Sequence, residues 1–148
     1  MKLAFFVPGV PQPKGSRRMM PVGGKTGALR HVLIEDGTRL TRPLRVSWYS
    51  RVAKHASAAF QGPSVASPVV ISALFRFPIA RSRLKGKRRL KPGDPHTQKP
   101  DGDKCLRGIF DPLKVAGVVI DDCVFFKFQA RKEWCAEGDE GAEVLLTW

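Results

Sequence analysis

Four aspartates form two tight pairs in a chain that has 26 Lys and Arg residues against 13 Asp and Glu residues. Asp101 and Asp103 are separated by one residue, and Asp121 and Asp122 are adjacent. Clustered carboxylates are costly unless a cation sits among them. A hard divalent cation such as Mg²⁺ suits them, since it takes one or two carboxylates together with water and phosphate oxygens. The pattern therefore indicates a metal site that activates water and polarises a phosphate.

The same residues also have purely structural interpretations. Asp101 and Asp103 would be favourable as capping acids at the positive end of a helix dipole. Asp121 and Asp122 would be an ordinary pair in a turn or an edge strand. Arg107 would be only the i, i+4 ion-pair partner of Asp103, which contributes about 0.2–0.5 kcal/mol. It is the combination with a polyanion-binding surface that favours a metal-dependent nuclease.

A helix that begins near Gly102 would position the first pair. Its apolar residues fall at i, i+3, i+4 and i+7, with a left-handed glycine expected as the terminator: Leu106, Ile109, Phe110, Leu113 and Gly117. Asp103 and Arg107 share the opposite side of this helix with Asp111 and Lys114, and Asp101 lies at its mouth. Gly108 and Pro112 are unfavourable inside a helix, and we expect a bend at the proline.

The second pair is predicted to lie in a strand. Val124, Phe126 and Phe128 alternate with Phe125, Lys127 and Gln129 after the apolar run 118–120. Adjacent residues of a strand point to opposite faces, so only one of Asp121 and Asp122 would join the first pair, unless a bulge intervenes.

The remaining pattern predicts an α+β fold in one domain, residues 1–148, with a mixed sheet and two helices packed against it. We expect a strand at 2–7, a basic loop at 8–18, a short strand at 29–34, a half-buried strand at 68–77, a basic loop at 79–100 and a last strand at 143–148. A helix at 43–60 is predicted to bury Val46, Tyr49, Val52, Ala53, Ala56 and Phe60, with Arg45 away from that stripe.

The charge is divided unevenly along the chain. Residues 1–93 hold 19 Lys and Arg against two acids, and residues 94–148 hold 7 against 11. Seven cations fall within residues 81–91. Such a surface favours a polyanion, because each neutralised phosphate releases condensed counterions. We therefore expect nucleic acid, in preference to a solvated cationic face or an anionic membrane surface.

Composition argues against several other classes. The chain has no stretch near the roughly 18 apolar residues of a membrane span, and its first apolar run stops at Pro8, too early for a signal peptide. We expect a soluble, cytoplasmic protein. Three cysteines without a CxxC spacing indicate neither a disulfide framework nor a zinc site. His31, His55 and His96 show no ligand spacing, and we expect them at the surface.

The segments around the acids resemble the RusA family of Holliday junction resolvases. Residues 99–107 read Lys-Pro-Asp-Gly-Asp-Lys-Cys-Leu-Arg, followed by Phe-Asp-Pro-Leu at 110–113, Gly117 and Asp121-Asp122. They are similar to the family's KPDxDN motif, its Lys three residues after the Asn, its D-x-L and its DD pair, without insertion between the acids. The early basic segment 9–18 looks like the family's opening.

The resemblance implies a homodimeric endonuclease dependent on Mg²⁺, with Mn²⁺ as an alternative and no small-molecule cofactor. It would nick symmetrically related strands of four-way DNA junctions in recombination and repair, an activity often encoded by prophages. By position, Asp101, Asp103 and Asp122 correspond to the metal-binding catalytic acids, and Asp121 to a lesser neighbour. A dimer suits this substrate, because two cuts across a two-fold junction call for two sites related by a two-fold axis.

The chain departs from the family at Lys104, where the family has Asn, and at Arg107, where it has Lys. Arginine can still stabilise charge on the phosphorane, but its planar fork is not a compact ammonium. Pro112 stands where the family prefers a helix former. We therefore expect activity that is reduced by these changes.

Three hypotheses follow. The first is a junction endonuclease in which Arg107 supports the transition state and basic residues bind the DNA arms: Lys14, Arg17, Arg18, Arg81, Arg83, Lys85, Lys87, Arg88, Arg89, Lys91, Lys99 and Lys104. The second is a non-catalytic or weakly catalytic junction-binding protein of the same fold. The third is an RNA-binding protein that prefers single strands, although its usual aromatic platform is not evident.

Overall fold

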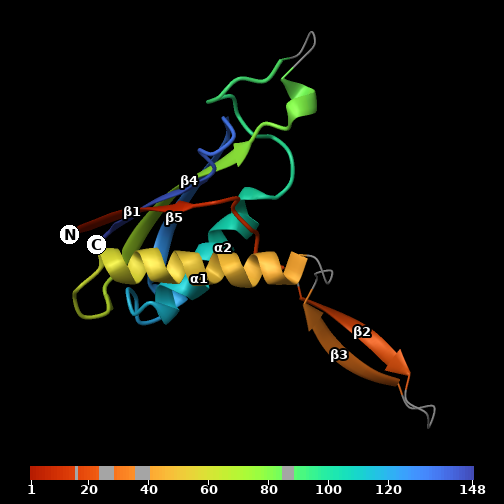
Figure 1. Cartoon of the computed structure of the whole chain (residues 1–148). Helices are drawn as coiled ribbons and strands as arrows, with labels where there is room; N and C mark the ends of the chain where they lie inside the picture. Colours follow the sequence, from red (N-terminus) through yellow and green to blue (C-terminus); the bar gives the residue numbers. More distant parts are fainter. Residues whose placement is uncertain (16, 24–28, 36–40, 85–88) are drawn as a thin grey trace.

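The central feature of the computed structural model is a four-stranded sheet in the order β1-β6-β4-β5 (Figure 1). The backbone is described for residues 1–15, 17–23, 29–35, 41–84 and 89–148, and side chains for 1–15, 42–84 and 89–148. The strands are β1 (Lys2–Pro8), β4 (Val69–Pro78), β5 (Phe125–Cys135) and β6 (Gly141–Thr147). β4 and β5 are parallel and the other pairs antiparallel, which confirms the predicted mixed sheet.

Strand β4 forms the centre of the core. Its residues alternate between buried and half-buried positions, as its sequence predicts, and Val69, Ile71 and Phe75 are fully buried. A strand with β-branched and aromatic residues on one face packs well between two neighbours. β4 therefore fixes the face of the sheet on which the helices lie.

Two helices cover that face, α1 (Thr41–Ala59) against β1 and α2 (Gly102–Val115) against β5. In α1 the buried residues are Arg45, Trp48, Val52 and Ala56. Val46 is 61% exposed, so the predicted stripe was wrong at its start, and the prediction that Arg45 lies away from the buried stripe was wrong as well. The large indole of Trp48 takes the core position, and a buried Arg45 can pack its aliphatic stem beside it.

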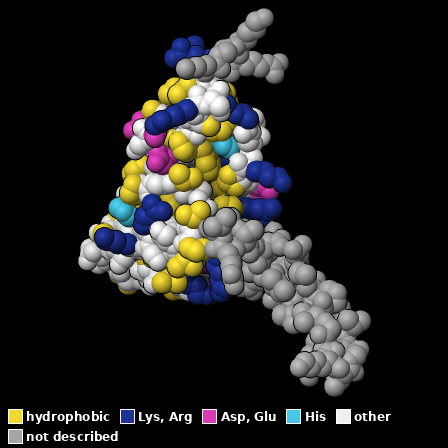
Figure 2. Space-filling model, turned by 45° about the vertical axis from the view of Figure 1, so that its right-hand side comes forward, with side chains coloured by type: hydrophobic (Ala, Val, Ile, Leu, Met, Phe, Trp, Pro, Cys, Tyr) yellow, Lys and Arg dark blue, Asp and Glu magenta, His cyan; other side chains and the backbone are white. Residues whose placement is uncertain are grey.

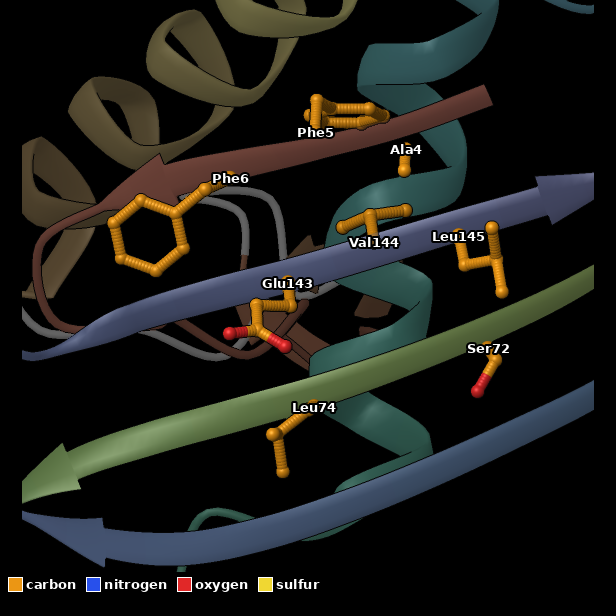
Figure 3. A pocket seen from close by; sticks show the side chains of 8 residues that line it. All are labelled: Ala4, Phe5, Phe6, Ser72, Leu74, Glu143, Val144 and Leu145. Atoms are coloured by element: carbon orange, nitrogen blue, oxygen red, sulfur yellow. The ribbon is translucent and has the colours of Figure 1, made fainter. Parts of the chain in front are cut away.

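The other face of the sheet is open. Figure 3 shows it with both helices behind the strands and a shallow pocket lined by Phe6, Leu74 and Leu145 among others. Phe6 and Leu145 are about two-fifths exposed, at 41% and 40%. This pocket lies on the opposite side of the sheet from α2, and it is therefore separate from the predicted acidic residues.

A second, two-stranded sheet pairs β2 (Arg17–Gly23) with β3 (Leu29–Glu35) and projects away from the main sheet (Figure 1). β3 confirms the predicted strand at 29–34. The predicted loop at 8–18 was too long, because Arg17 already belongs to β2. Pro21 lies within β2, and both strands of a two-stranded sheet are edges, where a missing donor is tolerated.

No helix in the described part of the chain is long and apolar enough to cross a membrane. The three cysteines are free thiols, in agreement with the expectation that no disulfide forms. The two chain ends lie side by side on neighbouring strands, where the Trp148 amide donates to the Met1 carbonyl at 3.1 Å.

The N-terminal loop crosses α2 at Gly108, and this contact is expected to control stability. A Cβ at Gly108 would lie 2.7 Å from the Gln12 carbonyl oxygen, whereas one at Gly102 would come no closer than 3.7 Å to any atom of a neighbouring segment. We expect Gly108→Ala to lower the free energy of unfolding by about 1–3 kcal/mol, although alanine normally favours a helix. Gly102→Ala is the control, and denaturant unfolding measures both. Greater stability of Gly108→Ala would contradict the close contact.

Candidate active site

The first turn of α2 carries two exposed carboxylates, each held by a cation. Asp101 is the N-cap residue, and its carboxylate lies 3.1 Å from the Lys104 ammonium. Asp103 lies 2.7 Å from the Arg107 guanidinium, as its i, i+4 spacing predicted. The Asp101 side chain makes no capping hydrogen bond, and the two carboxylates are 50% and 65% exposed. Capping therefore does not explain Asp101, and both acids are accessible to solutes.

The electrostatics of this turn favour the charged form of Asp103. The hydrogen bond from Arg107 lowers the pKa of the Asp103 carboxyl below its usual value. The neighbouring Cys105 is buried, and this burial raises the pKa of its thiol to about 12. At neutral pH the turn thus presents a carboxylate that only accepts hydrogen bonds, beside a neutral thiol.

The second pair lies in a turn before a strand, so the prediction that a strand carries it was wrong. Asp122–Val124 is a short 3-10 helix, and β5 begins at Phe125. The Asp121 carboxylate accepts a hydrogen bond from the Cys123 amide, an arrangement that closes such turns. The alternation rule for strands therefore does not decide which of the two acids faces the first pair.

Burial in β5 also differs from the pattern expected from alternation. Val124 and Phe125 are buried together, while Phe126 and Phe128 are 65% and 60% exposed. The pairing with β4 shifts register between Val69 and Val70, which leaves Phe126 as an extra residue. A bulge of this kind re-aims the residues around it.

Asp121 and Asp122 have opposite electrostatic environments. A hydrogen bond from Lys114, which comes from the last turn of α2, strongly lowers the pKa of Asp121. The neighbouring Asp121 in turn raises the pKa of Asp122, and Asp111 adds to that effect. The pair thus has one firmly ionised member and one that takes up a proton more readily.

The structure associates the two pairs with opposite ends of α2. Asp101 and Asp103 belong to its first turn, and Asp121 contacts Lys114 in its last turn. Within residues 1–15, 42–84 and 89–148, no three His, Cys, Asp or Glu side chains form a group that could hold a metal ion. The predicted set of metal ligands therefore remains a proposal.

Lys14 is brought to the same helix from the N-terminal loop. Its ammonium lies 2.6 Å from the Asp111 carboxylate, and its amide donates to the Lys104 carbonyl at 2.9 Å. Gly108 permits this approach, because any side chain there would meet the loop. The loop therefore places one predicted DNA-binding cation beside the helix that carries the acids.

The other predicted DNA-binding residues are only partly described. Arg81 and Arg83 form a short exposed 3-10 helix, η1 (Arg81–Arg83). Arg89, Lys91 and Lys99 are exposed, and Lys104 is half-buried. Lys85, Lys87 and Arg88 lie outside the described residues, as do the side chains of Arg17 and Arg18. Figure 2 shows basic side chains spread over one face of the molecule with apolar ones between them.

The segment before Asp101 is attached to β5, which sequence analysis missed. Residues 93–96 pair with the end of β5 through hydrogen bonds of Gly93, Asp94 and His96 with Lys132 and Trp134, 2.8–3.0 Å long. The expectation that His96 lies at the surface was wrong. Its ring is 5% exposed and lies 4.4 Å from the Phe77 ring and 4.1 Å from the Trp134 ring.

The buried His96 should make stability sensitive to mild acid. Burial, assisted by the Lys132 charge, lowers the pKa of His96 below its usual 6.5, so the folded state resists protonation more than the unfolded state does. The contribution of neutral His96 is complete above pH 6.5 and declines as the pH falls below that value. We expect wild type to lose stability between pH 7 and pH 5, and His96→Phe to lose less. Urea unfolding at both pH values measures this, and equal losses would assign the effect to other groups.

Comparison with known proteins adds an independent finding to this geometry. A family model described as endodeoxyribonuclease RusA matches residues 8–146 of the 148-residue chain. A search of curated proteins found no match. The match runs from the end of β1 into β6 and includes the N-terminal loop, both acid pairs and α2. The chain therefore belongs to the RusA family of endodeoxyribonucleases.

Proposed function

We propose that this chain is a metal-dependent endodeoxyribonuclease that resolves four-way DNA junctions by paired, symmetric nicks, in DNA recombination and repair. The observation that carries the proposal is the first turn of α2, where Asp101 and Asp103 are exposed and each is held by a cation. The family match covers this turn and supports a nuclease that acts on DNA junctions.

The donor set fits a divalent cation. Mg²⁺ takes only one or two protein carboxylates and completes its shell with water and phosphate oxygens, so a pair of carboxylates is sufficient. Asp101 and Asp103 would hold the ion at the first turn of α2. Asp122, with Asp121 beside it, would join them as a ligand only if the turn before β5 moves toward this end of the helix. When bound, a divalent cation would lower the pKa of an attacking water and stabilise the leaving oxygen. Mn²⁺ would fit the same oxygen ligands.

The cations of the site would act on the DNA. Lys104 and Arg107 neutralise the two carboxylates in the free protein, and a phosphate that enters the site would offer them an alternative partner. The Arg107 guanidinium can donate two parallel hydrogen bonds to a phosphate. Lys14, at the adjacent loop, is placed to bind a neighbouring phosphate, and the exposed cations of 81–99 would bind an arm of the junction.

The test is cleavage of a mobile four-way junction and of a linear duplex, with Mg²⁺ and with EDTA. We expect paired nicks on the junction that require Mg²⁺, and a loss of about 10²–10³ in rate for Asp103→Asn, the loss typical when one electrostatic stabiliser is removed. Asp139→Asn, an equal charge change at an exposed turn, is the control and should cut like wild type. Cleavage that persists in EDTA, or an active Asp103→Asn, would contradict the proposal.

A second candidate function is junction binding without efficient cleavage. It is favoured by Lys104, which holds the Asp101 carboxylate where the family has a neutral Asn, and by Arg107 in place of Lys. Tight junction binding with no cutting by wild type would support it. Recovery of Mg²⁺-dependent cutting in Arg107→Lys or Lys104→Asn would then identify the inhibiting residue.

We propose that the protein acts as a homodimer whose interface includes the start of β5. Phe126 and Phe128 are exposed on this edge strand. The Phe128 ring lies edge-on to the Phe110 ring of α2, with 6.3 Å between the ring centroids. Residues 93–96 pair with the end of β5, and the described part of the chain places no strand beside its beginning. An exposed aromatic edge of this kind is a pairing site for a second copy.

We expect wild type to have about twice its chain mass of 16.4 kDa in solution, and Phe126→Ser to shift toward the monomer. Phe6→Ser removes an exposed phenylalanine from the open sheet face and is the matched control. Light scattering coupled to size exclusion measures the mass. A monomeric wild type, or a dimer disrupted by Phe6→Ser alone, would contradict this interface.

A further inference from the structure

The segment that leads to Asp101 leaves β5 after His96 and then meets the Lys132 side chain. The Lys132 ammonium donates to the carbonyl of Gln98 and to that of Pro100, each at 2.6 Å. Lys132 is half-buried and stands opposite Phe75 in the register of β4 and β5. Its long side chain therefore reaches from the strand to the two carbonyls that flank residue 99.

The partners of the Lys132 ammonium are backbone carbonyls. Within the part of the chain that the structure describes, no carboxylate forms an ion pair with Lys132, and its ammonium donates to backbone oxygens instead. A charged donor forms shorter and stronger hydrogen bonds than a neutral one. Among the described residues, neither the Gln98 nor the Pro100 carbonyl accepts a hydrogen bond from a backbone amide, since the backbone pairing with β5 ends at His96.

The held carbonyls lie directly before the catalytic turn. Pro100 is covalently joined to Asp101, whose own carbonyl accepts from the Cys105 amide at 3.1 Å and so begins α2. A displacement of Pro100 would therefore move the Asp101 carboxylate, whereas Asp103 is held by the helix itself. The contact of Lys132 thus sets the place of one acid relative to the other.

We propose that Lys132 is a positioning residue of the active site, which fixes the approach of Asp101 to Asp103 by holding the carbonyls of Gln98 and Pro100. Its effect on cleavage rests on the proposed function. Its effect on segment 97–101 does not, and the experiment measures the two separately.

The experiment compares Lys132→Met with Arg76→Met. Methionine keeps much of the length of the stem and removes the donors and the charge. Arg76 lies on the neighbouring strand, where it pairs with Glu133 at 2.9 Å and Glu143 at 2.7 Å on the open face of the sheet. Both variants lose one partly buried cation, so they differ chiefly in whether the segment before Asp101 is held.

Three quantities are measured. We expect Lys132→Met to raise hydrogen exchange at the Cys105 amide, which donates to the Asp101 carbonyl, at least about tenfold. Junction nicking should slow about 10²-fold, the cost of misplacing a group by roughly 1 Å. Its affinity for the junction in EDTA should change less than about threefold, because Lys132 itself neutralises no phosphate. Arg76→Met should alter none of the three, and Lys132→Arg, which keeps the charge and donors, should recover part of the nicking.

Unchanged exchange at the Cys105 amide would overturn the proposal. A junction affinity that falls as much as the nicking rate would also overturn it, because Lys132 would then bind the DNA directly. If wild type itself does not nick junctions, the proposed function fails, while the exchange data still decide whether Lys132 holds this segment. If Lys132→Met does not fold, Lys132→Gln allows the same three measurements.

Discussion

The burial of one face of α2 is the interaction on which the site depends. Ile109 and Leu113 are fully buried and Leu106 nearly so, and a fully buried side chain of this size contributes about 1.5–3 kcal/mol. With this face fixed on the sheet, the opposite side of the helix must face solvent, and it carries Asp103 and Arg107. The absence of a side chain at Gly108 then lets the N-terminal loop cross the helix. Packing of the core therefore determines both where the acids are and which cations reach them.

Charge explains why exposed acids persist in so basic a chain. Each of Asp101, Asp103, Asp111 and Asp121 lies beside a Lys or Arg in the described structure. Exposed pairs of this kind add little stability, about 0–1 kcal/mol. Their more important consequence is that the acids do not repel DNA at long range, while each cation remains available to a phosphate. A divalent ion that binds would thus replace the cations beside the carboxylates, and the phosphates of a junction would become the new partners of those cations.

The sequence predicted the parts of this arrangement that are local. The period of α2, its terminator Gly117 at φ +71° and the pairing of Asp103 with Arg107 follow from spacing alone, and all are confirmed. Tertiary contacts were not predictable in this way. The burial of His96 depends on Phe77, about twenty residues earlier, and on Trp134, far along the chain, and the link from Lys132 to Pro100 spans 32 residues. The turn at Asp121 was missed because three apolar residues before it and alternating ones after it imitate a continuous strand.

The central claim is that Asp101 and Asp103, at the first turn of α2, bind a divalent cation. It is tested most directly by titrating the isotopically labelled protein with Mn²⁺ and following the paramagnetic broadening of its amide resonances. We predict that the amides of residues 101–104 broaden first, at the lowest Mn²⁺ concentration, and that Asp103→Asn abolishes this effect. Broadening that begins at other acids, such as Glu137 and Asp139, would contradict it.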